Sequence, residues 1–135
     1  MTRWYLLDTN TASYIIKGNI PAVRHHLVRL PMVQLAISAV TEGELRYGVA
    51  RQPAAKRLQQ IVDEFLIRVN ILPWDSAAAR EYGQLRAALE QTGQVMGNLD
   101  LMIGAHAVAL GATLVTNDRA FRRIRKLKLE DWTRR

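Results

Sequence analysis

The sequence predicts a single α/β domain, built on a short, mostly parallel β-sheet of four to five strands flanked by helices. Short apolar segments alternate with longer helical ones along the whole chain, which is the pattern of βαβ units. The chain has 135 residues, of which 49% are hydrophobic and 23% charged, as expected of one globular domain. No repeat or linker divides it, so the predicted domain covers residues 1–135.

Three elements open the chain. Residues 4–7 (WYLL) are apolar throughout, which is typical of a buried parallel strand. A turn and a helix follow over residues 8–18, where Gly18 provides the stop. A second helix is expected over residues 20–30, because Pro21 suits a first helical turn.

The middle of the chain again predicts a strand followed by two helices. A strand is expected at residues 33–37, and the helix after it is capped by Ser38 or Thr41 and ends before Pro53. Residues 54–65 continue as another helix, with apolar side chains at core-facing spacing.

A third strand is expected at residues 67–72, where Pro73 ends it. Ser76 then caps a long amphipathic helix that extends to about Gln91. Residues 92–98 (TGQVMGN) are rich in glycine and polar side chains, which favours a loop.

The last elements are shorter. A helix over residues 101–110 ends at Gly111, and a strand follows at 112–116. A short basic helix (RAFRRIRK, 119–126) and a last strand or sheet edge (LKLEDW, 127–132) complete the prediction.

The charge of the chain narrows the range of partners. Nineteen Lys and Arg against twelve Asp and Glu give a formal charge of +7, with a pI near 10.4. A basic surface attracts polyanions such as nucleic acids. The same balance also suits an acidic protein partner or a membrane surface.

Cysteine is absent, so the chain has neither a disulfide framework nor a zinc–thiolate site. The apolar run near the N-terminus is much shorter than a secretory signal needs. No apolar stretch reaches the roughly 18 residues of a membrane span. A cytoplasmic protein is therefore expected.

Four acids stand where apolar runs begin or end: Asp8, Glu44, Asp100 and Asp118. Asp8 and Asp118 follow predicted strands, Asp100 opens an apolar helix, and Glu44 lies about one turn into a helix. Strand carboxyl ends and helix N-termini converge on one edge of a parallel sheet, so these acids can meet there. Clustered carboxylates repel one another unless a cation neutralises them, and a hard divalent ion prefers oxygen ligands. The four acids thus predict a metal-dependent enzyme.

Each acid taken alone also fits a structural role. Asp8, Asp100 and Asp118 suit helix caps or turns, and Glu44 suits the boundary of a helix face. The prediction depends on their combination at one edge.

Polar and small neighbours of the acids complete the predicted site. Thr9, Asn10 and Thr116 are candidates for orienting the carboxylates through hydrogen bonds. Gly104, one turn after Asp100, is expected to leave room for a ligand.

The basic cluster that follows Asp118 is the candidate for binding RNA. Arg119, Arg122 and Arg123 would stand beside the acids, where they could hold phosphates. A run of charges is just as often only a solvated face.

Several motifs together resemble the PIN-domain ribonucleases, and specifically the VapC-type toxins of bacterial toxin–antitoxin pairs. LLDTN resembles the opening strand and first catalytic acid, Asp8, and ISAVTEGELRYGV resembles the segment that carries Glu44. LDLMIGAHAVALGATLVTND resembles the block with the third and fourth acids, Asp100 and Asp118. LKLEDW resembles the family's usual ending, so the resemblance covers nearly the whole chain.

The resemblance implies a PIN-like fold and an endoribonuclease that uses Mg²⁺ or Mn²⁺ held by the four acids. It implies cleavage of RNA, in several family members a tRNA, and so inhibition of translation. It also implies neutralisation by a cognate VapB-like antitoxin, a homodimer, and binding of operator DNA only through the antitoxin complex.

Two alternatives remain open from the residues. A phosphatase that forms a phospho-aspartate would need a second Asp two residues after Asp8, where this chain has Asn10. The other alternative is a basic binding domain whose acids are only caps. Metal dependence separates it from a nuclease.

Overall fold

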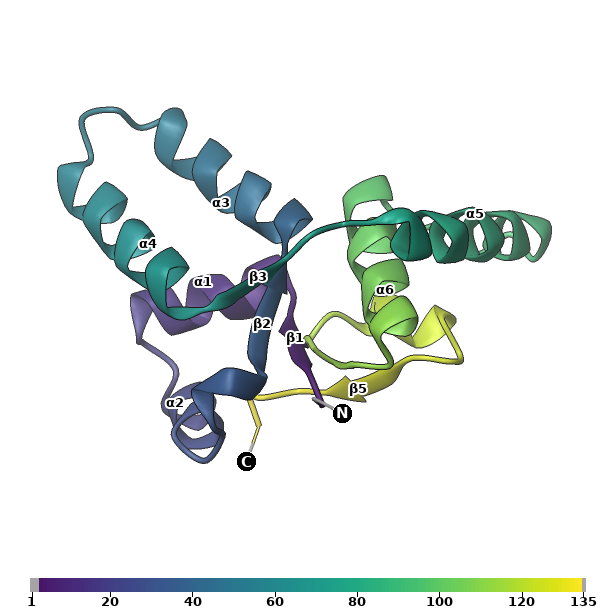
Figure 1. The fold of residues 1–135 in the computed structure, drawn as a ribbon, viewed down its shortest axis with the longest axis horizontal. Helices are drawn as coiled ribbons and strands as arrows, with labels where there is room; N and C mark the ends of the chain where they lie inside the picture. The colour runs from purple at the N-terminus through teal and green to yellow at the C-terminus, as the bar shows by residue number, and fades with distance from the viewer. Residues whose placement is uncertain (1–2, 135) are drawn as a thin grey trace.

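The computed structural model describes residues 3–134 and contains one five-stranded sheet in the order β3-β2-β1-β4-β5 (Figure 1). Every neighbouring pair of strands is parallel. The strands are β1 Tyr5–Leu7, β2 Leu35–Ser38, β3 Asn70–Leu72, β4 Thr113–Val115 and β5 Lys128–Glu130. The helices are α1 Thr9–Lys17, α2 Pro21–Leu27, α3 Ala39–Ala50, α4 Lys56–Arg68, α5 Ser76–Gln91 and α6 Asn98–Leu110, with 3-10 turns at η1 Met32–Gln34 and η2 Arg119–Arg123.

Alternate residues of β1 bury opposite faces of the sheet. Leu6 packs with apolar side chains of α5, α6 and the η2 segment, whereas Leu7 packs with those of α1, α2, α3 and α4. Both leucines are fully buried. The alternation follows from the two-residue period of a strand and gives three layers, with helices on both faces of the sheet.

The register of the central strands aligns one edge. Leu7 pairs with Ile37 of β2 and with Val115 of β4. The next residue of each strand or connection therefore reaches the same carboxyl edge, which brings Asp8 beside Thr116. The helices α3 and α6 both start at this end of the sheet, on opposite sides of β1, and in Figure 1 α3 extends away from the sheet whereas α6 runs back alongside it.

The predicted α/β fold is confirmed, and the sheet is parallel throughout the described residues. The boundary of the third strand was predicted wrongly: the strand expected at 67–72 begins at Asn70 because α4 continues to Arg68. Leu66 lies four residues after Val62 and is buried with it, so the continued helix buries one more apolar side chain and leaves Ile67 exposed.

Other boundaries differ for local reasons. Residues 32–34 form a 3-10 turn, so β2 begins at Leu35 rather than Val33. The N-cap of α5 is Asp75, which accepts the N–H of Ala78, and not Ser76. The second helix ends at Leu27, and the basic segment after β4 is helical only over the 3-10 turn η2.

The helix α6 begins earlier than predicted. The N–H of Leu101 donates to the carbonyl of Gly97, so the helix starts at Asn98 and Asp100 lies within its first turn instead of heading it. This position still favours a carboxylate, because the N-terminal end of a helix is positively polarised.

No helix within residues 3–134 has both the length and the apolar character needed to cross a membrane.

Candidate active site

Asp8 is buried at the end of β1 and accepts two hydrogen bonds. Its Oδ1 accepts the N–H of Thr11 at 2.8 Å, which caps α1, and its Oδ2 accepts the hydroxyl of Thr116 at 2.5 Å. Burial raises the pKa of Asp8 above its usual value, although these hydrogen bonds lower it. The nearby charge of Asp118 also raises the pKa of Asp8.

Asp118 is linked to Asp8 through the same hydroxyl. The N–H of Asp118 donates to Oγ1 of Thr116 at 3.0 Å, and its Oδ1 accepts the N–H of Ala120, which caps η2. Asp118 therefore combines the structural role of a cap with a position beside Asp8.

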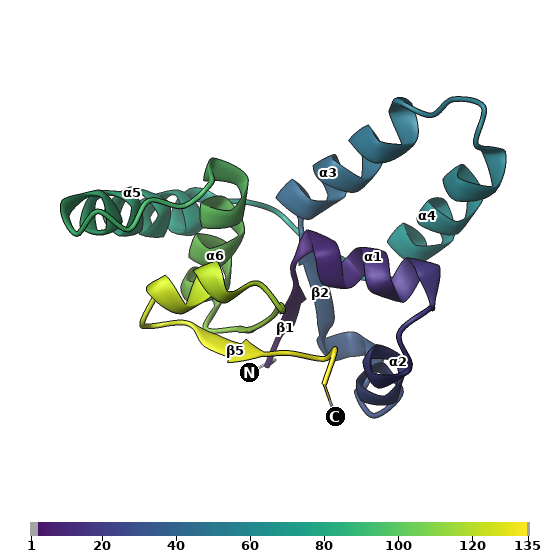
Figure 2. The same ribbon diagram turned by 180° about the vertical axis from the view of Figure 1, so that it is seen from behind.

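Glu44 reaches the site from α3. Its Oε1 accepts the hydroxyl of Thr9 at 2.6 Å, and the same hydroxyl lies 3.3 Å from Oγ1 of the buried Thr41. The first turn of α1 thus fixes a carboxylate of α3, and Figure 2 shows the start of α1 close to the start of α3.

Asp100 lies in the first turn of α6, and the charges of the other three acids affect its pKa. Burial is the main reason that the pKa of Asp100 is raised. The negative charges of the other acids raise this pKa further, in the order Asp118, Glu44 and Asp8. The structure therefore brings the other three predicted acids, each from a separate segment, within electrostatic reach of Asp100.

The donor set fits a hard divalent cation. All four side chains offer carboxylate oxygens, which Mg²⁺ and Mn²⁺ prefer, and an ion among them would relieve the repulsion that raises the pKa of Asp100. Among residues 3–134, however, no three Asp, Glu or His side chains are already close enough to share one ion.

Of the three residues predicted to orient the carboxylates, two contact an acid of the site and one does not. Thr9 and Thr116 each donate to a catalytic candidate, Glu44 and Asp8 respectively. Asn10 is exposed on α1, and within the described part of the chain it makes no hydrogen bond to the four acids.

The expectation for Gly104 was wrong. Gly104 is buried, and a Cβ added there would lie 2.6 Å from the Ile124 side chain, with Phe121 also in contact. Its lack of a side chain makes room for the η2 segment to pack on α6, not for a ligand.

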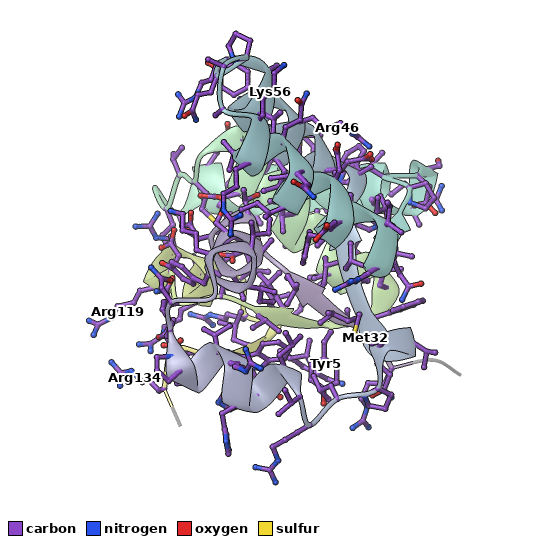
Figure 3. The ribbon with its side chains drawn as sticks, turned by 90° about the vertical axis from the view of Figure 1, so that its left-hand side faces the viewer. Tyr5, Met32, Arg46, Lys56, Arg119 and Arg134 are labelled. Carbon is purple, nitrogen blue, oxygen red and sulfur yellow. The ribbon has the colours of Figure 1, made fainter. Side chains whose placement is uncertain are left out.

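Two of the three predicted arginines share a hollow with Asp118, which Glu130 and Asp131 also line. Arg119 and Arg122 line a hollow of about 160 Å³ together with Thr116 and Asp118, and Arg119 projects away from the ribbon (Figure 3). Arg123 takes another direction, because its Nη1 donates to the carbonyl of Val95 at 2.8 Å.

Two further contacts support the site and were not predicted. The hydroxyl of Thr11 donates to the carbonyl of Val115 and joins α1 to β4. His106 is buried, its Nδ1 lies 2.9 Å from the Ser38 hydroxyl, and burial lowers its pKa. The position of Thr11 three residues after Asp8 signalled a capped turn, whereas nothing in the sequence indicated the pairing of Ser38 with His106.

Comparison with known proteins identifies relatives over nearly the full length. The family model for the PIN domain matches residues 5–127. Ribonuclease VapC2 of Rickettsia felis is 40% identical over 130 residues, which cover 95% of this chain and 97% of that protein. The tRNA(fMet)-specific endonuclease VapC of Shigella flexneri is 37% identical over 130 residues, covering 96% and 98%.

Solved structures of relatives also match the fold of this chain. The crystal structure of DNA-bound VapBC from Salmonella typhimurium superposes with a TM-score of 0.89 at 37% identity. The match covers 98% of this chain and 99% of that one.

Proposed function

This chain belongs to the PIN domain family, and we propose that it is a metal-dependent endoribonuclease that acts as the toxin of a toxin–antitoxin pair. The observation that supports this most strongly is the convergence of Asp8, Glu44, Asp100 and Asp118 on a chain 40% identical to a VapC ribonuclease. The proposed reaction is hydrolysis of an RNA phosphodiester.

The acids would hold the proposed cation, Mg²⁺ or Mn²⁺. Asp8 and Asp100 would gain most from the cation, because burial penalises their negative charge unless a cation compensates it. Glu44 and Asp118 complete the set directly or through water. A bound divalent ion would lower the pKa of the attacking water and offset the negative charge that develops on the phosphate.

Two hydroxyls orient these ligands. Thr116 presents its hydroxyl to Asp8 and leaves the other carboxylate oxygen to the N–H of Thr11. Thr9 fixes Glu44 in the same way. Both acids are therefore held in one orientation before RNA binds, which reduces the cost of assembling the reactive arrangement.

The proposed substrate is RNA, with tRNA as the first candidate. A relative at 37% identity carries the name tRNA(fMet)-specific endonuclease. The charge of +7 favours binding to a polyanion. Cleavage of a tRNA would inhibit translation, and we place the activity in the cytoplasm, where translation occurs.

The proposed protein partner is a VapB-like antitoxin. The Salmonella relative of known structure is a VapBC complex bound to DNA. By analogy, this chain would be neutralised by its cognate antitoxin, would bind operator DNA only through that complex, and would form a homodimer.

Expression in bacterial cells tests the toxin proposal. Induction of the parent chain should stop growth and deplete full-length tRNA(fMet), and co-expression of the cognate antitoxin should restore growth. Asp8→Asn should be harmless, whereas Asp63→Asn, at an exposed acid of α4, should remain toxic. Growth arrest by Asp8→Asn equal to that by the parent would contradict the assigned site.

A further inference from the structure

A separate hollow opens beside Glu44, between α1 and the pair of helices α3 and α4. Its volume is about 240 Å³, and Thr9 and Glu44 form the wall that it shares with the acidic site. Pockets for whole small molecules measure roughly 300–1,000 Å³, so this one suits a single part of a longer chain. We propose that it is a nucleotide subsite, which holds a base next to the scissile phosphate of RNA, and this rests on the proposed ribonuclease function.

The interior of the subsite is apolar. Its lining includes Leu45 and Val49 of α3, Leu58 and Val62 of α4, and Ile16 of α1. Aliphatic side chains can pack against the flat face of any nucleobase. The hydroxyl and amide groups that a base edge could pair with also line the hollow, and they belong to Ser13 and Gln52.

Two cations line the subsite from opposite sides. Lys17 is the last residue of α1, and Arg51 follows the end of α3. Neither forms an ion pair with an acid of residues 3–134. The guanidinium of Arg51 also lies 5.5 Å from the ring centroid of the exposed Tyr47. Since Glu44 is the one acid lining the hollow, these cations are free to hold the phosphates that flank a bound base.

A larger hollow on the far side of α1 from α3 is a weaker candidate for RNA. It measures about 450 Å³ and is lined by α1, α2, β2 and α4, but it touches none of the four acids. Its charged lining residues are Glu64 and Arg68, whose charges cancel. The smaller hollow has both the contact with Glu44 and the positive charge that RNA requires.

Gly48 allows the subsite to be filled. It lines the hollow from α3, and a Cβ added there would meet nothing within 4 Å. Gly48→Leu should therefore fold, since leucine is a better helix former than glycine, and its side chain should occupy the hollow. Gly83→Leu is the matched control, because Gly83 is exposed on α5 and equally open.

The measurement is binding of fluorescein-labelled tRNA(fMet) to the Asp8→Asn protein without added divalent metal, followed by fluorescence anisotropy. Gly48→Leu should weaken binding by at least about tenfold, which is the effect of losing roughly one well-packed base. Gly83→Leu should bind like the Asp8→Asn parent. Equal binding by Gly48→Leu, or no binding by the parent, would overturn the subsite.

Substituting the two cations of the hollow, Lys17 and Arg51, gives an independent test that adds no bulk to the helices. Lys17→Gln and Arg51→Gln should each lower the salt dependence of binding, by a slope of roughly 0.7 per lost phosphate contact. Lys56→Gln and Arg57→Gln, at the start of α4 and outside the hollow (Figure 3 labels Lys56), should lower it less. Equal slopes for all four variants would contradict the proposal.

Measuring RNA binding and RNA cleavage separately distinguishes a failure of the subsite from a failure of the proposed ribonuclease. A chain that binds tRNA through this hollow but never cuts RNA would refute the proposed ribonuclease and leave the subsite in place. A chain that cuts RNA while Gly48→Leu binds normally would refute the subsite alone. If Gly48→Leu binds RNA normally but is no longer neutralised by the antitoxin in cells, the hollow serves the protein partner and its assignment to RNA is wrong.

Discussion

The hydroxyl of Thr116 connects Asp8 to Asp118. It donates to Oδ2 of Asp8 at 2.5 Å and accepts the N–H of Asp118 at 3.0 Å. Thr116 directly follows β4, and Asp8 directly follows the paired strand β1. The distance between these two acids is therefore set by the pairing of two central strands and by one buried side chain.

Replacing Thr116 by valine should remove both hydrogen bonds at nearly constant volume. Asp8 would then be buried with one partner fewer, and loss of its orientation should slow RNA cleavage by about 10- to 100-fold at saturating metal. Thr116→Ser should recover most of the rate because it restores the hydroxyl. Turnover by Thr116→Val at the parent rate would show that this contact does not position Asp8 for catalysis.

Neutralising Asp100 should stabilise the metal-free fold at neutral pH. The pKa of Asp100 is raised in the folded protein, so the stability that this group contributes is present below its unfolded value of 3.8 and is lost as pH rises through the folded value. Asp100→Asn avoids that loss. In EDTA it should unfold at a higher temperature than the parent at pH 7, and this advantage should disappear on acidification.

Thermal unfolding followed by circular dichroism across this pH range measures the effect. Asp63→Asn, at an exposed acid, is the control and should change little. An advantage of Asp100→Asn that increases toward low pH would have the wrong sign for a carboxylate whose pKa is raised.

A methyl group at Gly104 should destabilise the fold. The added Cβ would lie 2.6 Å from Cδ1 of Ile124, so the end of that flexible side chain must shift, and because Ile124 is buried it must shift within the core. Overpacking of this kind costs about 1–3 kcal/mol. Urea unfolding should show this loss for Gly104→Ala, whereas Gly83→Ala, in open space on α5, should be neutral or gain up to about 1 kcal/mol. If Gly104→Ala is as stable as the parent, the η2 segment can move to make room for the added methyl group, and the predicted overpacking is wrong.

The three arginines after Asp118 should differ in their effect on RNA binding. Arg119 and Arg122 line the hollow beside Asp118, so glutamine at either position should weaken tRNA binding and lower its salt dependence by a slope of roughly 0.7. Arg123 is engaged with the Val95 carbonyl, so Arg123→Gln should leave that slope unchanged. Anisotropy titrations at several salt concentrations measure the slopes. An equal decrease for all three variants would show that the cluster acts only as a solvated charge.

The convergence of the acids could be predicted because it depends on strand ends. Asp8 and Asp118 follow short apolar strands, and the carboxyl ends of parallel strands must share an edge. The position of Glu44 depended on helical phase and on the family resemblance. Its contact with Thr9 also depends on how α1 crosses α3, which no spacing in the sequence encodes.

The features that the sequence did not predict depend on packing between segments that are distant in the chain. The extent of α4 follows from the burial of Leu66, and the role of Gly104 follows from the approach of Ile124, twenty residues later in the chain. The direction of Arg123 is decided by a carbonyl of the α5–α6 connection. Periodicity and composition describe one segment at a time, so such contacts lie beyond them.

Cleavage of RNA by the purified, antitoxin-free protein tests the central claim most directly. The parent chain and Asp8→Asn are each incubated with tRNA(fMet) in Mg²⁺, in Mn²⁺ and in EDTA. The proposed site predicts cleavage only by the parent with metal, and a rate for Asp8→Asn at least about 100-fold lower, as expected when a group essential to catalysis is removed. Cleavage by Asp8→Asn at the parent rate, or cleavage that persists in EDTA, would contradict a metal-dependent nuclease centred on Asp8.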